Sequence, residues 1–257
     1  MEDKLTDRTP QRVLVVAAHA DDIEFGCAGS VARWIAAGAS VTYCLVTDGA
    51  AGSNEPGADL AALVRLRREE QLAAARAVGV TDVRFLGYPD GILEPTLDVR
   101  RDITRVIRNV KPDRVVCQDP TTVFVRGSYI NHPDHRAAGE AAIYAVFPSA
   151  ETRPIFPELL DEGLEPHAVH DLYLMLTLEP DLVVDISDTV GQKIAALLCH
   201  KSQVGEDVAD WIRERGDETG KAEGYAYAEA FRVMVLAEDE VQEAQKADLA
   251  KEHAADK

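Results

Sequence analysis

The chain has 257 residues, of which 46% are hydrophobic, so it can bury one substantial core without disulfides or a second domain. Its formal net charge of −18 argues against nonspecific binding to nucleic acid, whose phosphates require a basic face. No apolar run approaches the length of a membrane span, and the first residues lack a secretory signal pattern, so we expect a cytoplasmic protein. The four cysteines show no CxxC spacing, which favours buried free thiols.

Short apolar runs alternate with helical patterns in the first half of the chain. We predict strands at residues 13–17, 40–46, 82–86 and 114–118, and helices at 24–36, 60–78, 97–110 and, after His135, through Ala145. This alternation predicts an α/β fold: a Rossmann-like, doubly wound, mostly parallel sheet with helices on both faces. In the order 3-2-1-4-5, the first and fourth strands are neighbours at the switch point, where such sheets bind ligands.

The pattern is looser after Ala145. Residues 147–166 contain four prolines and predict a long ordered loop near the crevice. We then expect strands at 170–176 and 182–186 in a hairpin-like extension, helices at 189–202 and 223–231, and an edge strand at 232–236. Residues 1–237 are expected to form one domain, and residues 238–257, rich in Ala, Glu, Lys and Asp, an exposed helix or a disordered tail.

Two polar stretches follow the first and fourth predicted strands. They are Ala18-His19-Ala20-Asp21-Asp22 and, after a polar loop, Asn131-His132-Pro133-Asp134-His135. Each stretch places histidine and carboxylate groups between a strand and a helix, at the sheet edge where ligands bind. Because the two strands are predicted neighbours, we expect the stretches to face each other across one crevice as a split metal site.

The residue types in these stretches suit zinc. A catalytic zinc has three nitrogen or oxygen ligands from the protein and one position left for water, and His19, Asp22 and His135 can supply those ligands. Asp21 is then free to deprotonate the water. His132, with its ring oriented by Asp134, can deliver a proton to a leaving amine or donate a hydrogen bond to the tetrahedral oxyanion.

Each of these residues, taken alone, also has an ordinary structural explanation. Asp21 or Asp22 can cap the following helix, Pro133 with Asp134 can begin a helix, and any one histidine can be a satisfied core residue. Two histidine motifs at matched positions of a doubly wound sheet make capping alone an insufficient explanation.

Three segments together resemble a known family. Residues 19–26, 86–91 and 132–136 are similar to the motifs of the PIG-L/LmbE-like zinc deacetylases, and the similarity extends from about residue 12 to residue 231. The resemblance implies the following roles: zinc ligands His19, Asp22 and His135, general base Asp21, second catalytic histidine His132, substrate-facing Arg67 and, on the crevice rim, Asp90.

Some of these implied roles have simpler alternatives. Arg67 can form an exposed i,i+3 ion pair with Glu70, and Asp90 can serve as a turn residue in Pro89-Asp90-Gly91. His200 also resembles a family pattern, and we interpret it as structural.

The chain departs from the family pattern at two positions. Ala20 stands where the family usually has proline, which removes some rigidity from the turn and no ligand. Ile130 stands where some members have an oxyanion-binding tyrosine, and the adjacent Tyr129 is expected to point elsewhere. Oxyanion stabilisation is therefore expected from zinc and His132.

We thus expect a zinc-dependent hydrolase that removes an N-acetyl or similar N-acyl group from an amino-sugar-containing small molecule. The alternatives are an amidase that cleaves a larger amide, such as a thiol conjugate, and a non-catalytic metal- or sugar-binding protein. The resemblance also implies a homo-oligomer, with a hexamer among the assemblies considered.

Overall fold

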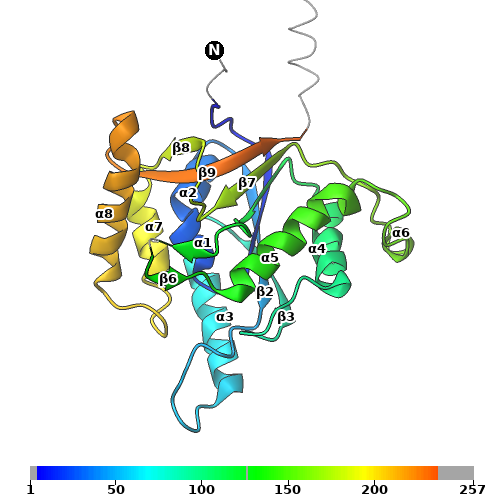
Figure 1. Cartoon of the computed structure of the whole chain (residues 1–257), viewed down its shortest axis with the longest axis horizontal. Coiled ribbons are helices and arrows are strands. Elements are labelled where there is room, and N and C mark those ends of the chain that lie inside the picture. Colours follow the sequence, from blue (N-terminus) through cyan, green and yellow to red (C-terminus); the bar gives the residue numbers. More distant parts are fainter. Residues whose placement is uncertain (1–4, 126, 237–257) are drawn as a thin grey trace, which may run out of the picture.

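The computed structural model describes residues 5–125 and 127–236. In this part of the chain a seven-stranded sheet has the order β3-β2-β1-β4-β7-β9-β8, and a two-stranded hairpin stands apart from it (Figure 1). The sheet strands are β1 (Arg12–Ala17), β2 (Ser40–Thr47), β3 (Asp82–Tyr88), β4 (Arg114–Gln118), β7 (Asp171–Met175), β8 (Leu182–Asp185) and β9 (Ala228–Val235), and the hairpin strands are β5 (Phe124–Val125) and β6 (Tyr129–Ile130).

Strands β3, β2, β1, β4 and β7 are parallel to one another, which confirms the predicted α/β fold and the predicted order 3-2-1-4-5. The expected hairpin between β7 and β8 is wrong, because β9 lies between them and pairs antiparallel with both. β1 and β4 are neighbours, with Val16 opposite Cys117, so the segments that follow them emerge side by side at one edge.

Helices cover both faces of the sheet (Figure 1). Alternate residues of β1 enter two cores: Val13 and Val15 face one, and Leu14 and Val16 face the other, which explains the continuous apolar run of this strand. The first core also receives α1 (Asp22–Gly26), α2 (Ala28–Ala36), α3 (Leu60–Ala77) and α7 (Val190–Leu197), and the second receives α4 (Leu97–Val110) and α5 (Pro133–Tyr144). A further helix, α8 (Val208–Gly220), packs on α7 through a small cluster of its own.

Helix starts follow from local sequence. The Asp59 side chain caps α3 by accepting from the Ala62 N–H at 2.9 Å, and Thr96 caps α4 in the same way. The helix predicted at 24–36 is broken, because Cys27 has a non-helical φ of −150° and separates α1 from α2.

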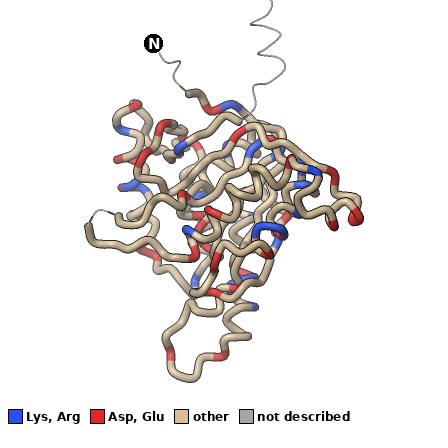
Figure 2. Tube along the Cα trace, turned by 45° about the vertical axis from the view of Figure 1, so that its right-hand side comes forward, with Lys and Arg blue, Asp and Glu red and all other residues tan. Residues whose placement is uncertain are grey.

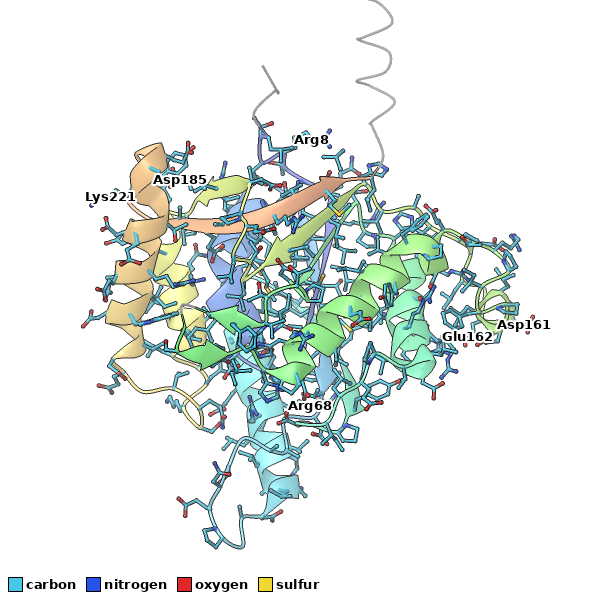
Figure 3. All side chains as sticks on the ribbon, in the orientation of Figure 1. Arg8, Arg68, Asp161, Glu162, Asp185 and Lys221 are labelled. Carbon is cyan, nitrogen blue, oxygen red and sulfur yellow. The ribbon has the colours of Figure 1, made fainter. Side chains whose placement is uncertain are left out.

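The proline-rich segment 147–166 is ordered, but its predicted place near the crevice is wrong. It contains most of a π-helical turn (Ala145–Ala150) and α6 (Glu158–Asp161), and it lies against α4. The buried Arg108 guanidinium of α4 holds it by donating to the carbonyls of Ser149 and Ala150, among others. In Figure 3, Asp161 and Glu162 mark this end of the molecule, across from Lys221 at the end of α8.

The second half holds three other differences from the prediction. The strand expected at the sheet edge at 232–236 is wrong in its place, because β9 lies between β7 and β8. The helix expected at 223–231 is wrong: a 3-10 turn (Lys221–Glu223) leads into β9, where the buried Glu229 accepts from the N–H groups of Gly29 and Ser30. Helix α8 was not expected. The predicted tail, 238–257, lies outside the described residues.

Asp and Glu residues are scattered over the whole described trace, with Lys and Arg among them (Figure 2). Within the described residues, the helices are either too short or too polar to cross a membrane.

Candidate active site

The two predicted polar stretches meet at the carboxyl ends of β1 and β4. The first forms the turn between β1 and α1, and the second begins α5, with Pro133 at its first helical position. The Gln118 side chain joins the two strand ends by accepting from the Ala18 N–H at 3.0 Å. Residues more than a hundred positions apart therefore line one crevice, as expected.

The Asp22 carboxylate lies between two imidazole rings. Its Oδ2 is 3.3 Å from His19 Nδ1, and its Oδ1 is 3.0 Å from His135 Nε2. Ligands held about 2.1 Å from a tetrahedral zinc have donor atoms roughly 3.4 Å apart, and each of these two pairs is close to that spacing through a different oxygen of Asp22. The His19 N–H also donates to Asp22 Oδ2 at 2.7 Å, which fixes the carboxylate between the rings and leaves Asp22 no role as a helix cap.

His132 lies close enough to the other two histidines to be an alternative to Asp22 as a metal ligand. Among the described residues, ring nitrogens of His19, His132 and His135 all lie within 4.8 Å of one another. His132, however, is the N-cap of α5, and its Nδ1 accepts from the Asp134 N–H at 3.2 Å. A neutral ring that accepts at Nδ1 carries its proton on Nε2, so Nε2 is a hydrogen-bond donor and has no lone pair for a metal.

Burial and the neighbouring His19 and His135 lower the pKa of His132, with Asp134 opposing them. The ring is therefore neutral at neutral pH. A neutral ring with a proton on Nε2 suits donation to an oxyanion better than protonation of a leaving amine.

Two further carboxylates surround His19. Its Nε2 lies 2.9 Å from Asp90 Oδ1 and 3.3 Å from Asp134 Oδ2. A histidine that donates from one ring nitrogen to a carboxylate presents the other nitrogen to a metal with fixed orientation. Although burial opposes it, the carboxylates of Asp22, Asp134 and Asp90 raise the pKa of His19 to about 12. The centre thus favours a cation.

Asp134 differs from its expected role, whereas Asp90 lies in the crevice wall. Asp134 Oδ1 is 3.9 Å from His132 Nδ1, and the same carboxylate accepts from the N–H groups of Gly91 and Leu93, so it mainly holds His19 and the following loop. The Asp90 side chain is 5% exposed, its Oδ2 accepts from the Ala51 N–H, and it lines the cavity described below, next to the candidate metal ligands.

Asn131 holds the other histidine of the candidate metal site. Its Oδ1 lies 3.1 Å from His135 Nδ1, and its amide donates to the Thr122 carbonyl at 2.8 Å, which fixes the orientation of the amide. With a proton on Nδ1, His135 has its Nε2 lone pair available for an ion held between Nε2 and Asp22. Asn131 stands in the second polar stretch, and its role is evident only from this contact with His135.

Asp21 has a left-handed backbone, with φ 94° and ψ −27°, and its side chain makes no capping hydrogen bond. Its N–H donates to the Gln71 side chain at 3.2 Å. Burial, together with Asp22 and Glu24, raises the pKa of Asp21 to about 7, although Arg67 opposes the rise. A carboxylate with such a pKa, beside the candidate ligands and not bound to either histidine, suits proton transfer near neutral pH.

Arg67 is buried, and the alternative of an exposed pair with Glu70 is wrong. Its guanidinium donates to the carbonyls of Gly49 and Ala20 and lies 3.8 Å from Asp21 Oδ2. Glu70 instead accepts from the N–H and hydroxyl of Ser202. Arg67 also lines the cavity described below.

His200 is fully buried, 3.2 Å from Glu24 Oε2, and Gln71 donates to the other oxygen of Glu24. This pair lies outside the residues that line the cavity, which supports the structural interpretation of His200.

A cavity of about 660 Å³ opens over the centre. It is lined by His19, Asp21, Asp22, His132 and His135 and by three residues for which the sequence pattern predicted no site role, Phe25, Trp211 and Arg215. Tyr129, expected to point elsewhere, also lines it. Such a volume is typical of small-molecule sites.

Comparisons with known proteins identify related deacetylases. The family model described as PIG-L, GlcNAc-PI de-N-acetylase, matches residues 14–146, a stretch that contains both histidine motifs. A diacetylchitobiose deacetylase of Thermococcus kodakarensis is 34% identical over 229 residues, covering 87% of this chain and 83% of that protein. A probable N-acetyl-alpha-D-glucosaminyl L-malate deacetylase 2 of Bacillus cereus is 31% identical over 200 residues, covering 75% and 84%.

Among solved structures, the N,N'-diacetylchitobiose deacetylase of Pyrococcus horikoshii in complex with its inhibitor MPG superposes with a TM-score of 0.81. It is 31% identical, and the match covers 88% of this chain and 84% of that one.

Proposed function

Because this chain belongs to the PIG-L family, we propose that it is a zinc-dependent hydrolase that removes the N-acetyl group from an amino-sugar-containing small molecule. The observation that carries the proposal is the Asp22 carboxylate, held 3.0 and 3.3 Å from the nitrogens of two histidines, with an uncapped Asp21 beside it in a cavity of about 660 Å³. The named deacetylases that this chain resembles act on N-acetylated sugars, and this favours an amino sugar as the substrate class.

His19, Asp22 and His135 would hold the zinc. When bound, zinc lowers the pKa of water and polarises an amide carbonyl. The carboxylates of Asp90 and Asp134 and the amide of Asn131 keep the two histidine rings in the orientation that this requires.

We assign both proton transfers to Asp21. Its carboxylate takes a proton from the attacking water as the C–O bond forms, and then gives that proton to the nitrogen as the C–N bond breaks, releasing acetate and a free amine. His132 donates from Nε2 to the carbonyl oxygen as negative charge develops there. Because the ring of His132 is neutral, Asp21 is the better donor to the leaving amine.

The test is a screen of N-acetylglucosamine derivatives with the zinc-loaded protein, in which free amine and acetate are both measured. We expect the two products in equal amounts. Release of a bulkier acid without acetate would replace the deacetylase with an amidase. A zinc-loaded protein that releases neither from any derivative would support a non-catalytic binding protein.

The ligand set is tested separately. We expect His135→Ala and Asp22→Ala each to lower the zinc content, because two remaining ligands hold the ion poorly. Full zinc occupancy in both variants, measured by elemental analysis at matched protein concentration, would overturn this assignment.

The proposal also includes a homo-oligomer and a cytoplasmic location. Light scattering coupled to size-exclusion chromatography tests the first, and fractionation of cells that express the protein tests the second.

A further inference from the structure

Two side chains of α3 hold the peptide bond that precedes Asp21. Its N–H, which belongs to Asp21, donates to Gln71 Oε1 at 3.2 Å. Its carbonyl, which belongs to Ala20, accepts from the Arg67 guanidinium at 2.9 Å. Arg67 and Gln71 are four residues apart on α3, so their side chains leave the same face of that helix. The two ends of one peptide group are therefore held from a single helix.

The peptide bond that follows Asp21 is held as well. Its carbonyl, which belongs to Asp21, accepts from the Phe25 N–H at 3.0 Å in the first turn of α1. With both neighbouring peptide planes fixed, the φ of 94° at Asp21 is imposed by its surroundings. Residues other than glycine are uncommon in this left-handed region, because their Cβ crowds the backbone there. Ala20 gives little support, since alanine does not restrict its own backbone as proline would.

The Gln71 amide is itself held in one orientation. Its Nε2 donates to Glu24 Oε1 at 2.9 Å, and Glu24 Oε2 lies 3.2 Å from Nε2 of His200. All three side chains are fully buried. Turning the amide over would bring its NH2 group to the Asp21 N–H and its oxygen to the Glu24 carboxylate, and neither pair can form a hydrogen bond. Glu24, supported by His200, thus selects the orientation in which Gln71 is an acceptor.

Gln71, Glu24 and His200, which we call the Gln71 network, come from three segments. Gln71 lies on α3, Glu24 on α1 and His200 just after α7, and both α1 and α3 contact α7 (Figure 1). In the described part of the chain, the residues that line the cavity do not include these three. The proposed proton transfers do not use them either. Buried polar side chains are costly unless they are hydrogen-bonded, and here their bonds lead to the backbone of Asp21.

We propose that the Gln71 network is a set of positioning residues, which keeps Asp21 in its left-handed conformation with the carboxylate beside the candidate metal ligands. Because Asp21 matters as the base of the proposed reaction, this inference rests on the proposed function. It gives the buried His200 a role that acts through Glu24 and Gln71, without contact with the reacting atoms.

Crystal structures test the positioning without any turnover. Methionine has nearly the shape of glutamine and lacks its amide, so Gln71→Met deletes the hydrogen bond to Asp21 with little change in volume. Wild type and variant are crystallised with zinc bound. We expect the Ala20–Asp21 peptide to rotate in the variant and the φ of Asp21 to shift away from 94°, which displaces the carboxylate. An unchanged backbone at Asp21 would overturn the proposal.

Steady-state kinetics on an N-acetylated sugar provides the second readout. We expect Gln71→Met to lower kcat by roughly tenfold to a hundredfold, as for a catalytic group misplaced by about 1 Å. KM and zinc content should stay nearly the same, because the Gln71 network does not line the cavity and supplies no candidate ligand. Thr104→Val is the matched control. Thr104 is fully buried in α4, and the change deletes its hydrogen bond to the Arg100 carbonyl with little change in shape, so kcat should stay the same.

A reciprocal exchange separates positioning from packing. Gln71→Glu alone places two carboxylates against each other, and Glu24→Gln alone leaves the orientation of the Gln71 amide unspecified. With both changes, the carboxylate at position 71 accepts from Asp21 and from the new amide at position 24, whose oxygen accepts from His200. We expect each single change to lower kcat and the double change to recover most of the loss. A double variant as impaired as the two single losses combined would overturn the proposal.

The outcomes separate this proposal from the proposed function. A displaced Asp21 that leaves kcat unchanged would support the Gln71 network and count against Asp21 as the base. An undisplaced Asp21 with unchanged kcat in Gln71→Met would overturn the network and leave the proposed function intact. If the wild type hydrolyses no N-acetylated sugar, the proposed function fails, and the crystal structures still decide whether the network positions Asp21.

Discussion

The two helices that begin at the crevice differ in how their first residue is used. Asp21 precedes α1 in a left-handed conformation and makes no side-chain capping bond, whereas His132 precedes α5 and caps it through Nδ1. The same position thus caps the helix in one case and not in the other. A non-glycine residue in the left-handed region costs on the order of 1 kcal/mol, so the uncapped arrangement at Asp21 is kept at the expense of stability.

This difference distinguishes a helix-start residue that is available for chemistry from one that caps the helix. Both residues were candidates for simple capping. The cap is present at His132, and it leaves Nε2 as the one group available for chemistry; it is absent at Asp21, whose carboxylate remains available for proton transfer. Four measurements test these assigned roles.

The largest effect is expected at Asp21. Asp21→Asn is nearly isosteric and cannot accept a proton, so turnover should fall by about a hundredfold to ten-thousandfold while the zinc content stays the same. The measurement is kcat together with elemental analysis of the same sample. Near-normal turnover would assign the base to another residue.

At His132, two substitutions separate the cap from the chemistry. Asparagine is a good N-cap, so His132→Asn should keep the melting temperature, while His132→Ala should lower it by a few degrees, as expected for the loss of about 1 kcal/mol. Both should reduce kcat and kcat/KM by a similar factor, on the order of a hundredfold, because both remove the Nε2 donor. If His132→Asn kept full turnover, His132 would be a cap and nothing more.

A smaller effect is expected at Asn131. Asn131→Ala removes the acceptor that orients His135 and should weaken zinc binding by roughly tenfold in a competition with a chelator. Asn131→Asp retains an oxygen acceptor and serves as the matched control. Equal affinity in the wild type and in Asn131→Ala would show that the ring needs no such support.

The smallest effect concerns stability of the metal-free protein. The folded-state pKa of Asp21, about 7, lies above the ordinary value of 3.8, so the folded state binds the extra proton and loses stability as pH rises from about 4 through 7. Asp21→Asn removes this penalty. It should raise the melting temperature of the chelator-treated protein by a few degrees, more at pH 8 than at pH 5. An equal gain at both values would mean that Asp21 titrates normally.

Much of the parallel half of the fold could be predicted because its signals are local. β1 and β4 are apolar runs buried on both faces, and Asp59 and Thr96 mark helix starts. The candidate metal residues were visible because each followed such a strand. The sequence did not reveal which carboxylate contacts which histidine ring, because Asp134 contacts His19 although the two residues are far apart in the sequence.

The antiparallel half was harder to predict, because tertiary contacts there override the helix and strand propensities of the sequence. The stretch predicted as a helix at 223–231 is rich in Ala and Glu, yet Glu229 is buried against the start of α2 and against Lys193, which fixes a strand. In α8, Gly216 and Gly220 are buried where larger apolar residues would mark a helix, and its apolar pattern is correspondingly weak.

The cavity takes its parts from separate stretches of the chain. The candidate ligands and Asp21 lie within residues 14–146, whereas Trp211 and Arg215 lie on α8, between two strands of the antiparallel edge. Changes on this helix can therefore reshape one wall of the cavity while the candidate ligands stay in place. The fold thus lets evolution, or a protein engineer, change one side of the cavity without changing the residues at its centre.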